Sequence, residues 1–346
     1  MDAKDLSLIV EPLLHWYREN KRDLPWRHHA TPYRVWISEI MLQQTRVDPV
    51  IPYYLRFMDE VPDVETLANL PEDQLMKLWE GLGYYSRARN LQKAAKQIVE
   101  AGAFPSDFNG WLSLAGVGEY TAGAICSIAL SLPTPAVDGN VLRVLSRILG
   151  SLDDIMLPAV KKSFTAALAE IYPPDATSDF TQSLMELGAT VCLPNGEPQC
   201  AKCPVASLCV AKNQGLIDQI PVKTAKKPRK IQKKTIFVLR SGSKVALSRR
   251  PKTGLLANLW EFPNVDDWLG EQQVKELFCS EKVKSLPASI HVFSHIEWHM
   301  VGYEVELSEE SSQYTWGEIG EVLSEKAIPA AFRCYTDHLK ELRYEV

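Results

Sequence analysis

The spacing of apolar residues changes character about two thirds of the way along the chain. In the first part they recur at intervals of three and four, as at Leu6, Ile9 and Leu13, which is the period of one face of a helix. The segment LPEDQLMKLWEGLG predicts a helix that begins at Pro71 and ends at Gly81. The same period predicts further helices at approximately residues 34–44, 86–101, 119–130, 140–149, 159–171 and 178–190.

After residue 235 the helical period gives way to β-branched and aromatic residues in partial alternation. The segments TIFVLR, KVALSRR and IHVFSHIEWHMVGYEVEL predict strands, and the tail from Pro329 predicts a closing helix. The pattern therefore predicts a multidomain protein in which an all-α domain precedes an α+β domain.

A basic segment, PVKTAKKPRKIQKKT, lies between the two patterns. It runs from Pro221 to Thr235 and contains lysines and an arginine but no acidic residue. A solvated, self-repelling tether and a phosphate-binding segment are equally consistent with this composition. We predict a helical domain over 1–221, a basic linker over 222–234 and a second domain over 235–346.

Composition sets broader limits. A chain of 346 residues with 46% hydrophobic content can form two ordinary cores. No apolar stretch approaches eighteen residues and the acidic N-terminus lacks a signal-peptide pattern, so we expect a soluble, cytoplasmic protein without a membrane partner. The net charge of −5 means that any binding of nucleic acid depends on local patches. Seven cysteines, an odd number, favour a reducing compartment over a disulfide framework.

Four of these cysteines follow one another with the spacing C-x7-C-x2-C-x5-C. Thiolates in such groups ligate iron-sulfur clusters or structural zinc. Zinc ligands are usually separated by two to four residues, and the Cys-Pro step is typical of ferredoxin loops, so we predict a cluster ahead of zinc. The predicted ligands are Cys192, Cys200, Cys203 and Cys209.

A glycine-rich turn lies in the segment LAGVGEYTAGAI. Gly116 and Gly118 allow a tight turn between two helices, and the amides at the start of the second helix suit a DNA phosphate. An ordinary helix-to-helix turn is the alternative interpretation.

Two carboxyl groups are candidates for acid-base chemistry. Asp138 directly precedes a helix, where free amides favour its ionised form, although a plain helix cap is an alternative. Glu39 is flanked by Ile37, Ile40 and Met41, where burial would keep it protonated; an exposed position is its alternative. An acid paired with an anion suits cleavage of a glycosidic bond.

Several motifs together resemble a known family. The segments ISEIMLQQT, GLGYYSRARNL, LAGVGEYTAGAI and VDGNVLRV, with the four cysteines, resemble the helix-hairpin-helix DNA glycosylases that carry an iron-sulfur cluster, and most closely the MutY family of adenine DNA glycosylases. The likeness runs from about residue 5 to the C-terminus. It implies a six-helix barrel, a domain with a [4Fe-4S] cluster and a C-terminal domain similar to the MutT (Nudix) fold.

The resemblance also implies roles for particular residues. Glu39 corresponds to the acid that protonates adenine, Asp138 to the aspartate that stabilises the sugar cation, and Tyr120 and Asn140 to active-site helpers. The residues that correspond to the family's duplex-invading set are Leu42, Gln43, Gln44 and Tyr84, and those that correspond to its 8-oxoguanine-inspecting loop are Phe293, Ser294 and His295. The implied partner is duplex DNA with adenine opposite 8-oxoguanine or guanine, bound by a monomer.

The sequence departs from the family pattern in three places. The first cysteine interval holds seven residues instead of six, and Ala115 replaces the proline of the hairpin. The segment RRPKTGLLANLWEFP resembles the start of the Nudix domain, but NVDDWLGEQQVKELF lacks the hydrolase residues, so we do not expect nucleoside diphosphate hydrolysis.

Two alternative functions remain at this point. One is an endonuclease III-like glycosylase and lyase, which needs a lysine where this chain has Tyr120. The other is a noncatalytic iron-sulfur protein that binds DNA.

Overall fold

The computed structural model describes residues 6–224 and 228–344, which form two compact units. The first unit joins Met1–Asn69 to Asn90–Ala225, and the second joins Leu70–Arg89 to Lys226–Val346. Part of the predicted helical domain therefore groups with the C-terminal part of the chain.

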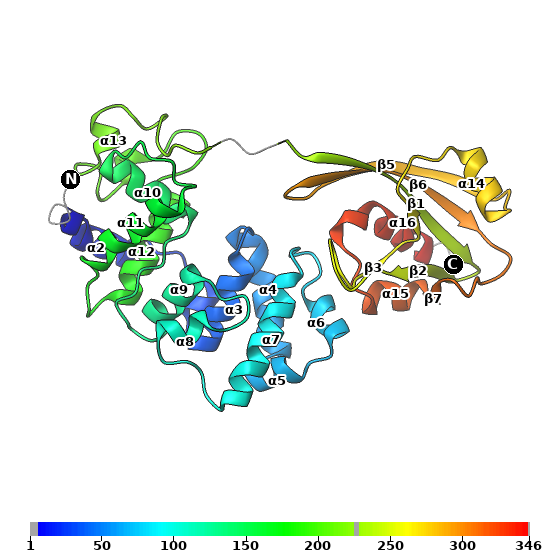
Figure 1. The fold of residues 1–346 in the computed structure, drawn as a ribbon, viewed down its shortest axis with the longest axis horizontal. Helices are drawn as coiled ribbons and strands as arrows, with labels where there is room; N and C mark the ends of the chain where they lie inside the picture. The colour runs from blue at the N-terminus through cyan, green and yellow to red at the C-terminus, as the bar shows by residue number, and fades with distance from the viewer. Residues whose placement is uncertain (1–5, 225–227, 345–346) are drawn as a thin grey trace. The chain divides into compact units, whose positions relative to one another are not determined.

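The first unit is helical (Figure 1). Its longer helices are α2 (Val10–Asn20), α3 (Pro32–Leu42), α4 (Val47–Glu60), α9 (Glu119–Ala129), α10 (Gly139–Leu149), α11 (Pro158–Ala169) and α12 (Thr177–Thr190), with most of α7 (Ser86–Ala101). Its shorter helices are α5 (Val64–Asn69), α8 (Phe108–Leu112) and α13 (Val210–Asn213), and α6 (Glu72–Leu78) belongs to the second unit. One apolar core joins α2, α10, α11 and α12.

Local signals explain the ends of the helices that carry the site. Helix α3 begins after Thr31, whose side chain accepts a hydrogen bond from the amide of Arg34, and has Pro32 at its first position. Helix α10 begins after Asp138 and ends at Gly150, which has a φ of 67°. All the predicted helices are present, whereas α4 was not predicted because Pro52 lies inside it.

The second unit is built on a mixed sheet in the order β3-β2-β1-β6-β5. Its strands are β1 (Lys230–Ser241), β2 (Lys244–Arg249), β3 (Trp260–Glu261), β4 (Asn264–Val265), β5 (Val283–Val292), β6 (Ile296–Glu306) and β7 (Thr315–Glu318). Strands β1 and β6 are parallel, and the other pairs are antiparallel. The prediction of an α+β domain after an all-α domain is confirmed.

Helices cover both faces of β1. Ile236 and Val238 belong to a core that includes α15 (Ile319–Glu325) and α16 (Arg333–Tyr344). Phe237 and Leu239 belong to a separate core that includes α14 (Glu271–Phe278). The central strand is therefore buried on both sides, which explains its almost continuous apolar sequence.

Strand β1 begins at Lys230, so residues 230–234 of the predicted linker form part of the sheet. Lys234 is buried and lies 2.5 Å from the carboxylate of Asp266. At the other end, Val222 pairs with Asp154 in an isolated bridge. Lys226 and Lys227 lie outside the described residues.

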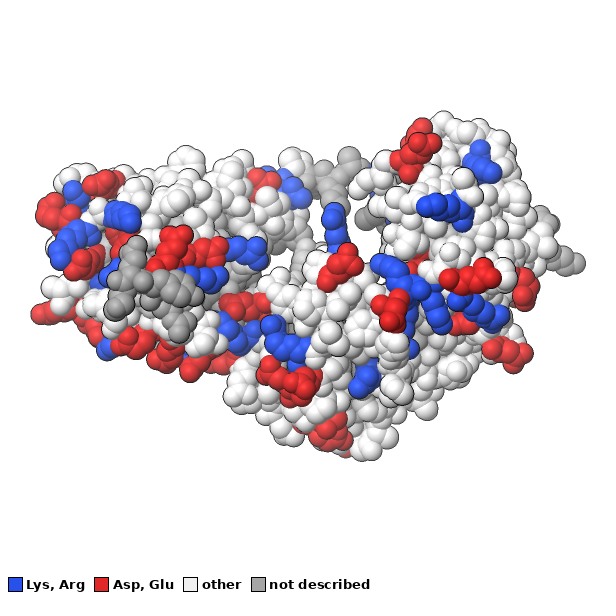
Figure 2. All heavy atoms as spheres, turned by 180° about the vertical axis from the view of Figure 1, so that it is seen from behind, with Lys and Arg blue, Asp and Glu red and all other residues white. Residues whose placement is uncertain are grey.

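Charges of both signs are mixed on the face shown in Figure 2. This mixture agrees with the small net charge of −5. Within residues 6–224 and 228–344, we find no helix both long enough and apolar enough to cross a membrane.

Candidate active site

A cavity of about 1250 Å³ opens in the helical unit, between residues of α3, α9, α10 and α12. The four predicted catalytic residues all line it: Glu39, Tyr120, Asp138 and Asn140. These residues are up to about a hundred positions apart in sequence, so the packing of the helices brings them together. Cavities of this kind, with a few convergent polar groups, are where ligands usually bind.

Glu39 is buried on α3, with 6% of its surface exposed. The hydroxyl of Tyr120 donates a hydrogen bond of 2.5 Å to its carboxylate. Burial raises the pKa of Glu39 to about 7, and the charge of Asp138 adds to the rise, whereas the hydrogen bond from Tyr120 lowers it. Glu39 is therefore not on an exposed polar stripe, and it can hold a proton near neutral pH.

Asp138 caps α10. Its carboxylate accepts hydrogen bonds from the amide of Val141 at 2.7 Å and from the side chain of Asn140 at 2.9 Å. Arg143 in turn donates to the side-chain oxygen of Asn140 at 3.0 Å, which fixes the orientation of that amide. Asp138 is therefore a helix cap, and its carboxylate is held by one backbone amide and one side-chain amide.

We expected the free amides at the start of α10 to favour the ionised form of Asp138 and so to lower its pKa, and this expectation was wrong. Burial raises this pKa above the ordinary value, and the hydrogen bonds from Val141 and Asn140 only oppose that rise. The two carboxyl groups are thus both shifted upward. Removal from water outweighs the helix terminus at Asp138.

A buried ion-pair network forms another wall of the same cavity and was missed from the sequence. Glu186 accepts from Arg22 at 2.7 Å and from Arg27 at 2.7 Å, and Arg27 also donates to Gln182 at 3.0 Å. All four line the cavity. The available signal was the four-residue spacing of Gln182 and Glu186, which puts both on one face of the predicted helix over 178–190.

Five residues predicted to bind DNA also line this cavity: Leu42, Gln43, Gln44, Gly116 and Gly118. The side chain of Gln43 donates to Thr121 on α9 at 3.3 Å. Gly116 has a φ of 74°, and a Cβ there would lie 2.5 Å from that of Asn90, so the turn requires glycine.

Tyr84 is not among the residues that line the cavity and belongs to the second unit. It has a φ of 47° and is 44% exposed. The guanidinium of Arg87 lies 5.5 Å from its ring and 5.4 Å from the ring of Trp79. Tyr84 is thus an exposed aromatic ring on a constrained turn, not a core residue.

Phe293, Ser294 and His295 form the turn between β5 and β6. The amide of Phe293 donates to the carbonyl of Ile296 at 2.9 Å, which closes the turn. Ser294 and His295 are exposed, whereas the ring of Phe293 packs edge-on against Trp298 at 4.9 Å.

The four predicted cysteine ligands line one small cavity of about 20 Å³. All four are free thiols, and Arg147 donates to the sulfur of Cys192 at 3.3 Å. Burial raises the pKa of Cys203 to about 11. In the described part of the chain, no group of three or more His, Cys, Asp or Glu side chains converges as the ligands of a single metal ion would. Thiolates are the donors that hold iron-sulfur clusters, and all four of these thiols line the one cavity.

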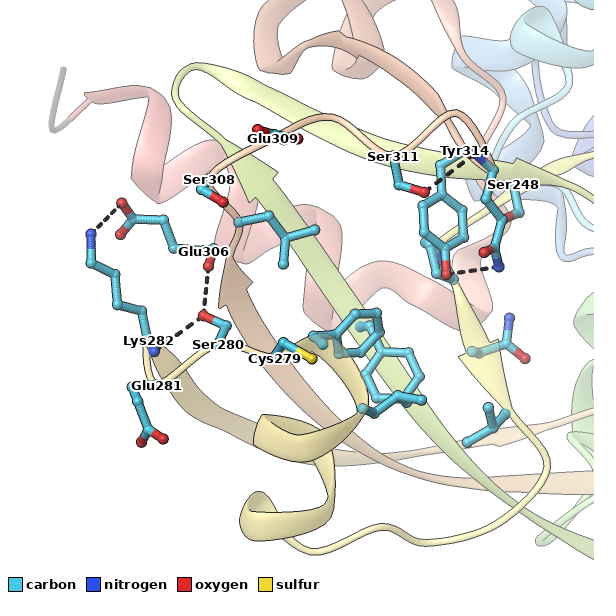
Figure 3. Close-up of a pocket in the computed structure, with 18 of the residues that line it drawn as sticks. Ser248, Cys279, Ser280, Glu281, Lys282, Glu306, Ser308, Glu309, Ser311 and Tyr314 are labelled. Carbon is cyan, nitrogen blue, oxygen red and sulfur yellow. Dashed lines mark hydrogen bonds and ion pairs between the residues drawn. The ribbon is translucent and has the colours of Figure 1, made fainter.

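The second unit has a cavity of its own, of about 900 Å³, between the end of α14, β1 and the connection from β6 to β7 (Figure 3). Its carboxylates are mostly ion-paired. Glu306 lies 2.6 Å from Lys282, and Glu261 lies 2.5 Å from Arg250.

Comparisons with known proteins agree with both parts of the fold. Residues 37–174 match the HhH-GPD superfamily of base excision DNA repair proteins, and residues 235–338 match the NUDIX domain. An adenine DNA glycosylase of Mus musculus is 35% identical over 99% of this chain and 80% of its own length. One from Buchnera aphidicola is 34% identical over 88% of this chain and 89% of its own.

Among solved structures, a thermostable thymine-DNA glycosylase superposes with a TM-score of 0.55 and is 27% identical. The superposition covers 61% of this chain and 98% of that one.

Proposed function

The chain belongs to the adenine DNA glycosylases, enzymes that hydrolyse the N-glycosidic bond of adenine in DNA, and we propose that its substrate is duplex DNA with adenine opposite 8-oxoguanine or guanine. The observation that carries the proposed mechanism is the meeting of Glu39 and Asp138 in one cavity, each bonded to a neutral donor.

Glu39 is the general acid in this proposal. With a pKa of about 7 it holds a proton near neutral pH and can give it to the leaving adenine. Tyr120 orients the carboxyl group through its hydrogen bond of 2.5 Å. Protonation makes the base a better leaving group, and Glu39, then ionised, can accept a proton from the attacking water.

Asp138 stabilises the positive charge that develops on the sugar. Its two hydrogen bonds, from Val141 and Asn140, hold the carboxylate in place on α10. A fixed anion in a buried site stabilises an oxocarbenium-like transition state more than it would in water.

The adenine is proposed to enter the cavity after it leaves the base stack. Arg27 and Gln182 line the wall near Glu39 and offer polar groups that can meet the edge of a base. Leu42, Gln43, Gln44 and Tyr84 are the proposed wedge in the duplex, and Gly116 and Gly118 the proposed contact to phosphate.

A [4Fe-4S] cluster is the proposed cofactor, held by Cys192, Cys200, Cys203 and Cys209. Their shared cavity supports this assignment. The cluster would tie the segment after α12 to α10, where Arg147 contacts both Cys192 and Cys209. In this role it supplies structure and takes no part in the reaction.

Recognition of 8-oxoguanine is proposed to reside in the turn Phe293–His295. A base-release assay on matched duplexes with adenine opposite 8-oxoguanine or guanine tests this. Ser294→Ala with His295→Ala should retain excision opposite guanine and lose most of the preference for 8-oxoguanine. A melting curve is the control, because both side chains are exposed and a folded variant should melt as the wild type does. A folded double variant with the wild-type preference would show that this turn is not the reader.

A further inference from the structure

Residues 249–259, from the end of β2 to the start of β3, contact residues that lie next to two elements proposed to bind DNA. One is Leu70–Arg89, which carries Tyr84, and the other is the turn Phe293–His295. All three segments belong to the same compact unit. The proposed function so far gives the 249–259 segment no role.

Three polar contacts attach this segment to Leu70–Arg89. Arg249 lies 2.7 Å from the carboxylate of Asp73, and Asn258 donates to Glu72 at 3.1 Å. Arg89 donates to the carbonyl of Ala257 at 2.5 Å. Arg249 also donates to the side-chain oxygen of Asn258 at 3.2 Å, so the first two contacts are linked to each other.

On its other side the segment supports the base of the turn Phe293–His295. The guanidinium of Arg250 lies 5.4 Å from the ring of Trp298, and the amine of Lys234 lies 4.8 Å from the same ring. Trp298 is 1% exposed, and the ring of Phe293 packs against it at 4.9 Å. The position of Phe293 therefore depends on a tryptophan that two cations hold.

The segment itself is closed by its own backbone. The amide of Asn258 donates to the carbonyl of Pro251, and that of Arg250 to the carbonyl of Leu259, each at 2.9 Å. Leu256 and Asn258 both have a φ of 54°. These hydrogen bonds tie the two ends of the segment to each other.

We propose that the 249–259 segment is a positioning element that fixes Tyr84 and the turn Phe293–His295 relative to each other, with Arg249 and Asp73 as its principal positioning pair. This inference rests on the proposed function of those two elements. As a consequence, Tyr84 and the turn Phe293–His295 would contact the DNA as one rigid unit. Recognition of 8-oxoguanine by the turn would then favour insertion of Tyr84 beside the adenine.

Charge reversal tests the proposal. Arg249→Glu and Asp73→Arg should each lower the preference for 8-oxoguanine over guanine by about tenfold, within the range of coupling between contacting residues. The combined variant restores the opposite charges and should recover the preference to within about threefold of the wild type. Asp73→Arg is informative by itself because Arg249 also lies 4.8 Å from the ring of Trp260, a packing contact that Asp73 does not share.

Lys244→Glu is the matched control, since it breaks an ion pair of the same length, 2.7 Å, with Glu310 elsewhere in the unit. It should leave the preference unchanged. Recovery in the combined variant separates positioning from general destabilisation, because the combined variant restores one specific pair. If both single variants melt normally and keep the wild-type preference, the proposal is wrong.

The two proposals can fail separately. If Ser294→Ala with His295→Ala keeps the preference, the turn is not the reader, and the coupling proposal falls with it. If that variant loses the preference while Arg249→Glu and Asp73→Arg keep it, the reader stands and only the coupling is wrong.

Discussion

Carboxyl groups line both cavities described above, but the partners of Glu39 and Asp138 differ from those of Glu306 and Glu261. In the helical unit, Glu39 and Asp138 bond to a phenol, an amide side chain and a backbone amide, all of them uncharged. In the C-terminal unit, Glu306 and Glu261 lie 2.6 and 2.5 Å from a lysine and an arginine. The two cavities are of similar size, about 1250 and 900 Å³.

The difference teaches what makes a carboxyl group reactive. A buried carboxyl group whose hydrogen-bond donors are uncharged keeps its proton to higher pH, because the charged form has lost water and has no cation bonded to it. An ion pair supplies an opposite charge: burial raises the pKa of Glu186, but Arg22 and Arg27 outweigh it and hold the pKa below its ordinary value. Size and acidity alone would not have singled out Glu39 and Asp138, whereas the uncharged donors bonded to them distinguish them from Glu186 in the same cavity, which two arginines hold.

The largest expected effect comes from removing the carboxyl groups of Glu39 and Asp138. Glu39→Gln or Asp138→Asn should slow adenine release by about a thousandfold or more, the upper part of the range for a positioned acid or a fixed anion. Duplex binding, measured by fluorescence anisotropy, should change only a few-fold, since neither group is needed to hold phosphate.

Glu306→Gln is the matched control from the second cavity and should leave adenine release within a few-fold of the wild type. Comparable losses from Glu306→Gln, or near-normal turnover in Glu39→Gln, would remove the distinction between the two cavities.

Substitution of the cysteines should produce the next largest effect, and only the cysteines of the helical unit should show it. Serine at Cys192, Cys200, Cys203 or Cys209 should lower the iron content and the melting temperature, because a metal site formed on folding contributes to stability. Cys279→Ser, at an exposed cysteine in the second cavity, should change neither. Iron analysis and the visible spectrum decide the outcome, and stoichiometric zinc without iron would favour the zinc site.

The pH dependence of the reaction sharpens the contrast further. Glu39 must be protonated to act as an acid, so the single-turnover rate should fall as the pH rises through its pKa of about 7. The hydrogen bond from Tyr120 lowers that pKa, so Tyr120→Phe should move the fall in rate to higher pH. A pH profile that stays in place, or moves to lower pH, would contradict the assignment of Glu39.

The sequence predicted what depends on local pattern. Apolar spacing predicted the helices that carry the site. Ile37, Ile40 and Met41 around Glu39 suggested its burial, but an exposed position on the same helix remained the alternative until the structure showed it buried. The upward shift of the Asp138 pKa was missed, because it depends on how far α10 is buried by other helices. Helix α4 was missed because Pro52 breaks the usual pattern.

Contacts between distant residues could not be predicted in the same way. Glu186 meets Arg22 across 164 positions, and Arg249 meets Asp73 across 176. Nothing in the local sequence around either residue of a pair points to its partner, so periodicity gives no sign of the pairing. Only the packing of whole elements selects one partner among many.

The smallest expected effect concerns strand scission. A lyase needs a primary amine that attacks the sugar, and Tyr120 stands where the resemblance places that lysine. Among the described residues that line the catalytic cavity, Lys161 alone carries such an amine, and it lies 3.5 Å from the carboxylate of Glu119. The ion pair with Glu119 thus engages that amine. The product should therefore be an intact abasic strand that breaks only after alkali, and Lys161→Ala should leave this unchanged. Efficient nicking without alkali, with a borohydride-trapped adduct that disappears in Lys161→Ala, would show that the cavity supports a second reaction.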